Sequence, residues 1–170
     1  MTITAGPEDL LRLEHQVCFT LNSASRAFGG VYREALRELD LTYPQYLVML
    51  TLWEHGELPV KRIGELLRLD SGTLSPLLKR LEAAGRVRRA RSAEDERSVV
   101  VHLTAAGDAM RAQARQVPRR IAAATGLDPA ELRVLQGMLL RLTEHLDAGA
   151  EVLREQGGGA DPDGPDGTGE

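Results

Sequence analysis

The chain has 170 residues, of which 42% are hydrophobic, 27% are charged and 4% are aromatic, and its formal net charge is −4. This length is sufficient for one domain, whose core must be mainly aliphatic. No apolar stretch approaches the roughly 20 residues that cross a membrane, and the N-terminus lacks the basic and hydrophobic segments of a signal peptide. We therefore expect a cytoplasmic protein without a membrane partner.

Helices with one apolar face are predicted in the N-terminal part. Apolar residues recur at helical spacing over residues 7–28, and Gly29–Gly30 is expected to end this first helix. A shorter helix is predicted over residues 31–39, and a third over residues 44–55. The apolar face of the first helix needs a covering surface, which a second copy of the chain would supply.

A helix-turn-helix is predicted between residues 60 and 85. A first short helix covers residues 60–67, and Asp70 caps a second helix, which ends at Gly85. Leucines at helical spacing give the second helix one buried face. The residues expected on its outward face, where they can hydrogen-bond to bases and phosphates, are Ser71, Thr73, Ser75, Lys79 and Arg80.

The pattern then changes to a two-residue period, which predicts a β-hairpin. Residues 87–91 alternate, residues 92–98 form a charged turn, and residues 99–103 are a β-branched strand. Residues 61–97 include ten Lys or Arg and six Asp or Glu, a local net charge of +4. A basic stretch alone is usually a solvated surface. Here it coincides with a helix-turn-helix and a hairpin, and this combination predicts DNA binding, with Arg88 among the contacting residues.

Two more helices and a tail are predicted in the C-terminal part. Thr104 caps a helix that reaches about Thr125, and Asp128–Pro129 begins a last helix with a leucine stripe. Residues 155–170 carry five acidic residues and no basic one, and their Gly- and Pro-rich composition predicts a disordered tail. Without this tail the net charge is about +1, which suits a DNA-binding protein.

The predicted fold is mostly α with a small β-hairpin wing. It is a winged helix-turn-helix whose N- and C-terminal helices form a dimerisation layer, and two-fold symmetry would place two recognition helices about one DNA turn apart. The alternative is that the outer helices complete the core of a monomer. The expected regions are a helical dimerisation region over 7–42 and 104–154, the winged helix-turn-helix over 43–103, and the acidic tail over 155–170.

Two parts of the sequence resemble a known family. The order of predicted elements resembles that of the MarR family of bacterial regulators over about residues 8–150, and LDSGTLSPLLKRLEAAGRVRRARSAEDERSVVVHLT is similar to its recognition helix and wing. HQVCF, the following Tyr32 and LTYPQYLVMLTLWEH resemble its organic-hydroperoxide-sensing, OhrR-type branch. The resemblance implies a homodimeric repressor that binds pseudo-palindromic operator DNA and is not an enzyme. It also implies that Arg97, oriented by Asp95, enters the minor groove.

The same resemblance implies a redox switch. In the OhrR-type branch an organic hydroperoxide oxidises a cysteine near the N-terminus, which matches Cys18, and the repressor then releases DNA. Two tyrosine hydroxyls, one from each subunit, bond this cysteine, and they match Tyr32 and Tyr43. Asn22 stands where the branch commonly has another tyrosine, so the pocket is expected to be more polar or tuned to a different oxidant. The resolving cysteine of some members is absent from this sequence.

The residue types support this chemistry independently. Cys18 is the only cysteine, which excludes an internal disulfide and a thiolate-rich zinc site. A thiol of ordinary pKa is a thiolate only in small part at neutral pH, and hydroxyl donors would favour the anion that attacks a peroxide. Without a second cysteine, the sulfenic acid would be capped by a low-molecular-weight thiol, cyclise onto a backbone nitrogen or be oxidised further. A lone cysteine is also common as an inert small hydrophobe.

Three other functions are alternatives to this interpretation of the sequence. A MarR-type repressor can sense an aromatic or phenolic ligand in the cleft between the dimer layer and the DNA-binding lobe, with Cys18 structural only. A thiol peroxidase is disfavoured, because there is no resolving cysteine and the four histidines lack metal-ligand spacing; no metal and no cofactor is predicted. An architectural DNA binder would lack operator preference.

Overall fold

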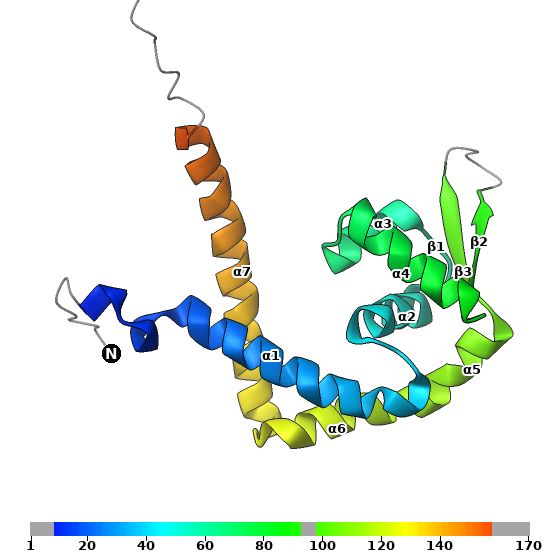
Figure 1. Cartoon of the computed structure of the whole chain (residues 1–170), viewed down its shortest axis with the longest axis horizontal. Helices are drawn as coiled ribbons and strands as arrows, with labels where there is room; N and C mark the ends of the chain where they lie inside the picture. The colour runs from blue at the N-terminus through cyan, green and yellow to red at the C-terminus, as the bar shows by residue number, and fades with distance from the viewer. Residues whose placement is uncertain (1–8, 93–97, 158–170) are drawn as a thin grey trace, which may run out of the picture. The chain divides into compact units, whose positions relative to one another are not determined.

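The computed structural model describes residues 9–92 and 98–157, and it divides the chain into one unit up to Thr125 and a second from Gly126. The first unit holds every element but the last (Figure 1). In chain order its elements are the 3-10 helices η1 (Asp9–Leu11) and η2 (Leu13–His15), α1 (Val17–Ala35), the 3-10 helix η3 (Arg37–Leu39), α2 (Tyr43–His55), β1 (Leu58–Pro59), α3 (Val60–Leu67), α4 (Ser71–Ala83), β2 (Val87–Arg91), β3 (Val99–Leu103), α5 (Ala105–Ala114) and α6 (Gln116–Thr125). The second unit contains α7 (Pro129–Gly157).

The predicted helix-turn-helix and hairpin are confirmed. The Asp70 carboxylate accepts a hydrogen bond from the Thr73 backbone N–H at 2.8 Å and so caps α4. At the other end, Gly85 adopts φ = 68°, the left-handed conformation in which a glycine commonly ends a helix. Strands β2 and β3 pair antiparallel, with Arg89 opposite Val101. The fold is therefore mostly helical with a small wing, as expected.

One strand was not predicted. The two residues of β1 pair antiparallel with β3, so the sheet has three strands in the order β1-β3-β2. Its central strand carries Val101, which is fully buried. Two residues are too few to show an alternating pattern, which explains why the sequence did not reveal β1. The short strand attaches the base of the wing to the start of α3.

A hydrophobic core fills the first unit between α2, α4, the sheet and the α5–α6 segment. Trp53 donates its indole N–H to the Gly107 carbonyl at 3.1 Å, which joins α2 to α5. A Cβ at position 107 would collide with the Arg86 carbonyl, so only glycine allows α5 to approach the base of the wing this closely. The largest side chains that are fully buried are Tyr46, Leu36, Met49, Leu52, Ile63, Leu74, Leu78, Leu81, Val48, Val87 and Val101.

The predicted boundaries of the first two helices are wrong, whereas the third, predicted over residues 44–55, matches α2. The first α-helix begins at Val17 after two 3-10 turns, and it continues through Gly29–Gly30 to Ala35 instead of ending there. Each glycine costs a helix interior about 1 kcal/mol relative to alanine. Val31 and Tyr32 pack against the core just beyond the glycines and hold the helix together. The segment before Val17 buries no apolar side chain within the chain, and a short isolated helix is only marginally stable.

Two predictions in the C-terminal part also need correction. The helix capped by Thr104 is divided at Arg115 into α5 and α6, because Pro118 has no N–H for the Ala114 carbonyl and its ring crowds that carbonyl. The last helix begins as predicted, with the Asp128 carboxylate accepting from the backbone N–H groups of the first turn. It extends through Gly157, so the expected tail is helical over its first three residues; residues 158–170 lie outside the described part.

Large apolar side chains remain exposed at both ends of the described chain. Ala35 is the only buried residue of α1. In the first unit the exposed apolar residues before the glycine pair are Leu10, Leu11, Leu13, Val17, Phe19 and Phe28. In α7 they are Val134, Met138, Leu139, Leu140, Leu146, Val152 and Leu153. None of the described helices combines the length and apolar character of a membrane span.

Candidate nucleic-acid interface and cysteine site

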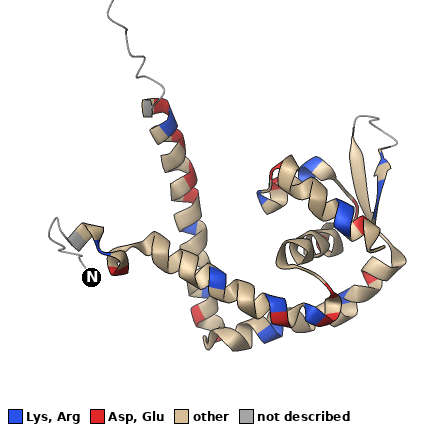
Figure 2. Cartoon of the chain, in the orientation of Figure 1, with Lys and Arg blue, Asp and Glu red and all other residues tan. Residues whose placement is uncertain are grey.

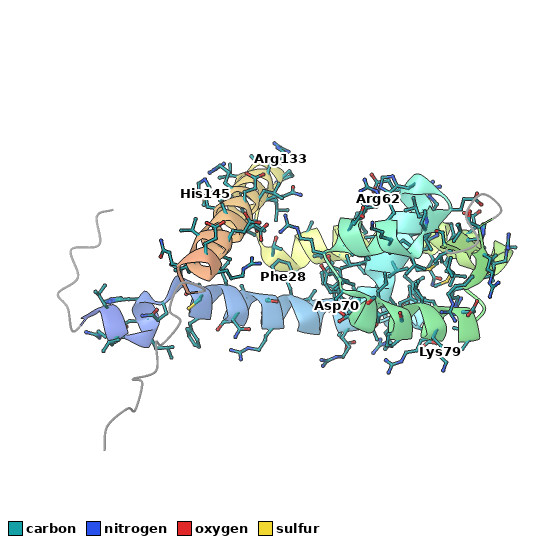
Figure 3. The ribbon with its side chains drawn as sticks, turned by 90° about the horizontal axis from the view of Figure 1, so that it is seen from above. Phe28, Arg62, Asp70, Lys79, Arg133 and His145 are labelled. Carbon is teal, nitrogen blue, oxygen red and sulfur yellow. The ribbon has the colours of Figure 1, made fainter. Side chains whose placement is uncertain are left out.

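The outward face of α4 is polar and accessible. Its inner face is anchored by Leu74, Leu78 and Leu81, each at most 1% exposed. Figure 3 shows Asp70 at the start of this helix and Lys79 extending away from the body of the unit. The structure leaves all five residues predicted on the outward face exposed: Ser71, Thr73, Ser75, Lys79 and Arg80. The Thr73 hydroxyl is already engaged, because it donates to the Asp70 carboxylate at 2.9 Å.

The wing places further cations beside this helix. Figure 2 shows Lys and Arg on β2 and on the neighbouring helices. Arg88 is exposed, as predicted, and it lies opposite His102 in the hairpin. The other two predicted wing residues, Asp95 and Arg97, lie outside the described residues. Within the described part, the wing therefore contributes its base and strands to the candidate interface.

The sequence did not reveal the contact that joins the wing to α4. Glu82 accepts from the backbone N–H of Arg89 at 2.8 Å through Oε1, and from the Arg89 guanidinium at 2.7 and 2.8 Å through Oε2. These hydrogen bonds from Arg89 hold the pKa of the Glu82 carboxyl below its ordinary value. The alternating pattern of β2 could have indicated this contact, because it places Arg89 on the same strand face as buried Val87.

A hollow of about 420 Å³ lies between α4, the start of α3 and the wing. Lys61, Ser75 and Arg89 contribute polar side chains to its wall, and Leu78 and Val99 contribute apolar ones. A second exposed carboxylate–arginine pair, Arg62–Glu65 at 3.0 Å, lies within α3 and outside the lining of this hollow.

Cys18 and the two predicted tyrosines do not meet within one chain. Cys18 is exposed at the second position of α1, and Tyr32 is fourteen residues further along the same helix. At 1.5 Å per residue, this separation is about 21 Å. The rings of Tyr32 and Tyr43 lie together, with centroids 4.3 Å apart. The structure thus brings the two tyrosines together and leaves the cysteine at the other end of the helix.

The tyrosines form an aromatic cluster that continues into the core. Tyr32 contacts Tyr46, whose ring meets the edge of Trp53; both centroid distances are 6.3 Å. Burial, and to a lesser degree neighbouring Tyr43, raises the pKa of Tyr32 above its ordinary value of 10.0. Its phenol therefore keeps its proton at neutral pH and can donate a hydrogen bond. The Tyr43 side chain is 41% exposed, so it is accessible to a partner.

A separate hollow of about 500 Å³ lies between α2 and the α5–α6 segment. Its wall includes the aromatic residues Tyr46 and Trp53 and the cations Arg111 and Arg115. The buried Tyr46 hydroxyl has no hydrogen-bond partner among the described residues. An unpaired buried hydroxyl is costly, so this is a place where a ligand acceptor or donor would be favourable. Within residues 9–92 and 98–157, no three metal-binding side chains gather into a metal site.

Comparison with known proteins relates the chain to transcriptional regulators. Residues 31–112 match the family described as transcriptional regulator SarA/Rot. The chain is 47% identical over 145 residues to the HTH-type transcriptional regulator TtmR of Methylorubrum extorquens (strain PA1), covering 85% of this chain and 74% of that protein. It is 45% identical over 138 residues to the organic hydroperoxide resistance transcriptional regulator of Bacillus subtilis (strain 168), covering 81% of this chain and 94% of that protein.

A solved structure of a similar protein contains DNA. The chain resembles reduced AbfR of Staphylococcus epidermidis bound to DNA, with 36% identity and a TM-score of 0.67. The match covers 82% of this chain and 96% of that one.

Proposed function

Because the chain belongs to the MarR family of transcriptional regulators, we propose that it binds operator DNA as a homodimer and releases it when an organic hydroperoxide oxidises Cys18. The relatives are regulators, so the thiol peroxidase considered from the sequence is not retained. The single observation that carries the redox half is the position of an exposed cysteine between the exposed apolar side chains of Val17 and Phe19.

The DNA half of the proposal rests on the α4 surface and the wing. The exposed hydroxyls and cations of α4 suit the donor and acceptor pattern of the major groove, and the cationic strand β2 suits the phosphate backbone. The structure of the similar protein AbfR on DNA supports the same use of this fold.

The dimer half rests on the exposed apolar residues of η1, η2, α1 and α7. Exposed apolar surface on this scale is uncommon on a monomer, and a two-fold interface would remove it from water. Two copies would also present two recognition helices to a pseudo-palindromic operator. We propose that residues 7–42 and 104–154 supply this interface.

The geometry of the tyrosines then determines how a sensing site is assembled. Since Tyr32 packs against Tyr43 and lies about 21 Å along α1 from Cys18 of the same chain, we propose that both hydroxyls that reach this thiol come from the partner subunit. The expectation of one tyrosine from each subunit does not fit this arrangement. Each dimer would hold two equivalent sites, each with Cys18 of one subunit and both tyrosines of the other.

The reaction at such a site would consume one organic hydroperoxide and one low-molecular-weight thiol. The Cys18 thiolate attacks the terminal peroxide oxygen, the O–O bond breaks, and the OH group stays on sulfur as a sulfenic acid while the leaving alkoxide takes a proton from water and becomes an alcohol. A low-molecular-weight thiol then attacks the sulfenic acid, forming a mixed disulfide and releasing water. The bulky adduct at a packed subunit junction would favour a second arrangement in which the recognition helices no longer match the operator.

Operator binding before and after oxidation tests the proposal. The probe is a duplex from the region upstream of the protein's own gene, with cumene hydroperoxide as oxidant and cysteine as the small thiol. Wild type should bind and then release this duplex, and Cys18→Ser should bind equally well and not respond. Ser25→Ala, at another exposed position of the same helix, is the control and should still respond. An unchanged response of Cys18→Ser would contradict redox sensing.

The hollow beside Tyr46 favours a second candidate function. Aromatic walls, an unpaired buried hydroxyl and two arginines suit an aromatic or phenolic anion. In this case salicylate would release DNA from Cys18→Ser as well as from wild type, and Arg115→Gln would abolish the release. Absence of any salicylate effect on DNA binding would exclude this candidate for that ligand class.

A further inference from the structure

Glu82 has an unusual position for a carboxylate, because it lies on a surface that we propose faces DNA, which is a polyanion. Its acceptor atoms are fully used by one residue: Oε1 takes the Arg89 backbone N–H, and Oε2 takes two guanidinium N–H groups. The three bonds join the last turns of α4 to the middle of β2. Both guanidinium bonds end on Oε2 while Oε1 holds the backbone N–H, so one carboxylate fixes the side chain and the backbone of Arg89 together.

From this geometry we infer that Glu82 is a positioning residue for DNA recognition, which sets the wing relative to α4 and shapes the hollow between them to receive one strand of the DNA sugar–phosphate backbone. The hollow has the required chemistry, since Lys61, Ser75 and Arg89 line it and can bind phosphate oxygens. This inference rests on the proposed DNA-binding function and adds residues that the sequence did not suggest.

The location of the hollow supports a backbone site. When a recognition helix occupies the major groove and a wing reaches the adjacent minor groove, the strand that separates the two grooves must pass between helix and wing. Ser75 on α4 and Arg89 on β2 lie on the two sides of this hollow. A wing that rotated away from α4 would widen it and separate the phosphate contacts.

The direction of the change in DNA affinity distinguishes a positioning role of Glu82 from a simple effect of its negative charge. Removal of an acidic group from a DNA-binding surface would strengthen binding to every duplex if charge alone mattered. Loss of positioning instead weakens binding to the operator and leaves binding to a scrambled duplex the same or stronger. We expect Glu82→Gln to lower the operator affinity about tenfold and Glu82→Ala to lower it further, because Gln retains an acceptor for the backbone N–H.

The experiment measures dissociation constants for the operator duplex and a scrambled duplex of equal composition at one salt concentration. Glu65→Gln is the matched control, because it removes the same charge from an exposed arginine pair within α3 and should not lower operator affinity. Hydroxyl-radical footprints should show that Glu82→Ala loses protection in the minor grooves while the central major-groove contacts persist. If Glu82→Ala does not fold, Glu82→Asp provides the same test with the negative charge retained, because its shorter side chain cannot hold both groups of Arg89 in this geometry.

Two results would overturn the inference. Operator binding by Glu82→Gln that equals or exceeds wild type would show that Glu82 does not position the wing. An equal loss of affinity for operator and scrambled duplexes would show a general defect without loss of positioning. If wild type itself fails to prefer the operator, the proposed function fails. If wild type prefers the operator and the Glu82 variants bind as wild type does, only this inference fails.

Discussion

The segment from α2 to β3 and the segment from η1 through most of α1 bury very different amounts of apolar surface. In the first, Leu52, Ile63 and Val101 are fully buried within a single chain. In the second, Leu11 is 89% exposed and Val17 is 63% exposed. The DNA-binding part is therefore specified by contacts within one chain, whereas the N-terminal part lacks the contacts that would define its surroundings.

This difference indicates which part of the molecule determines each half of the proposed function. The orientation of α4 and the wing follows from the core, the Asp70 cap and the Glu82–Arg89 contact. The environment of Cys18 follows from whatever covers α1, and we propose that a second copy does so. A chemical change at a subunit junction can thus alter the spacing of two recognition units without unfolding either one.

The largest expected effect is loss of the dimer. Val17→Asp would bury a carboxylate twice in a two-fold interface, which should raise the dimer dissociation constant by at least about 100-fold. Val99→Asp, at an exposed position on the wing, is the control and should leave the dimer intact. Sedimentation velocity at micromolar concentration measures both. An unchanged dimer in Val17→Asp would place the interface elsewhere.

A smaller effect is expected from the core of the DNA-binding part. Leu52 is 0% exposed, and Leu52→Ala should lower the free energy of unfolding by about 2–5 kcal/mol through lost burial and the cavity left behind. Leu66→Ala, on α3 and 38% exposed, should cost much less. Urea denaturation compares the two variants. Equal losses would contradict the assignment of this core.

The smallest effect concerns the cap of α4 and its pH dependence. Hydrogen bonds from Thr73 hold the pKa of Asp70 below its ordinary value of 3.8, so the charged carboxylate stabilises the fold above that value and the stabilisation is lost as the pH falls through the lowered pKa. Asp70→Asn retains a capping oxygen and cannot titrate. Its melting temperature should therefore fall less steeply below about pH 4 than that of wild type. Parallel curves would show that the cap does not depend on charge.

The elements that the sequence predicted well carry local signals. The Asp70 cap, the end at Gly85 and the alternation of β2 lie within a few residues of the structures that they determine. The passage of α1 through Gly29–Gly30 could not be predicted in this way, because it depends on core contacts made by Val31 and Tyr32. The partner of Arg89 likewise depends on how α4 and the wing pack.

The proposed sensing site likewise depends on contacts between segments that are distant in the sequence. The resemblance identified Cys18, Tyr32 and Tyr43 as candidates and implied one tyrosine from each subunit, which the positions of these residues in one chain do not favour. The helical separation within α1 and the close packing of the two rings are the observations from which we propose that one subunit supplies both tyrosines and the other supplies the thiol.

A mixed dimer tests this central claim most directly. One subunit carries Cys18→Ser, and the other carries Tyr32→Phe with Tyr43→Phe. If the site forms between subunits, the remaining Cys18 faces two intact tyrosines and should react with cumene hydroperoxide at the wild-type rate per thiol, whereas the homodimer with both phenylalanines should react slowly. A mixed dimer as slow as that homodimer would contradict a site shared between subunits.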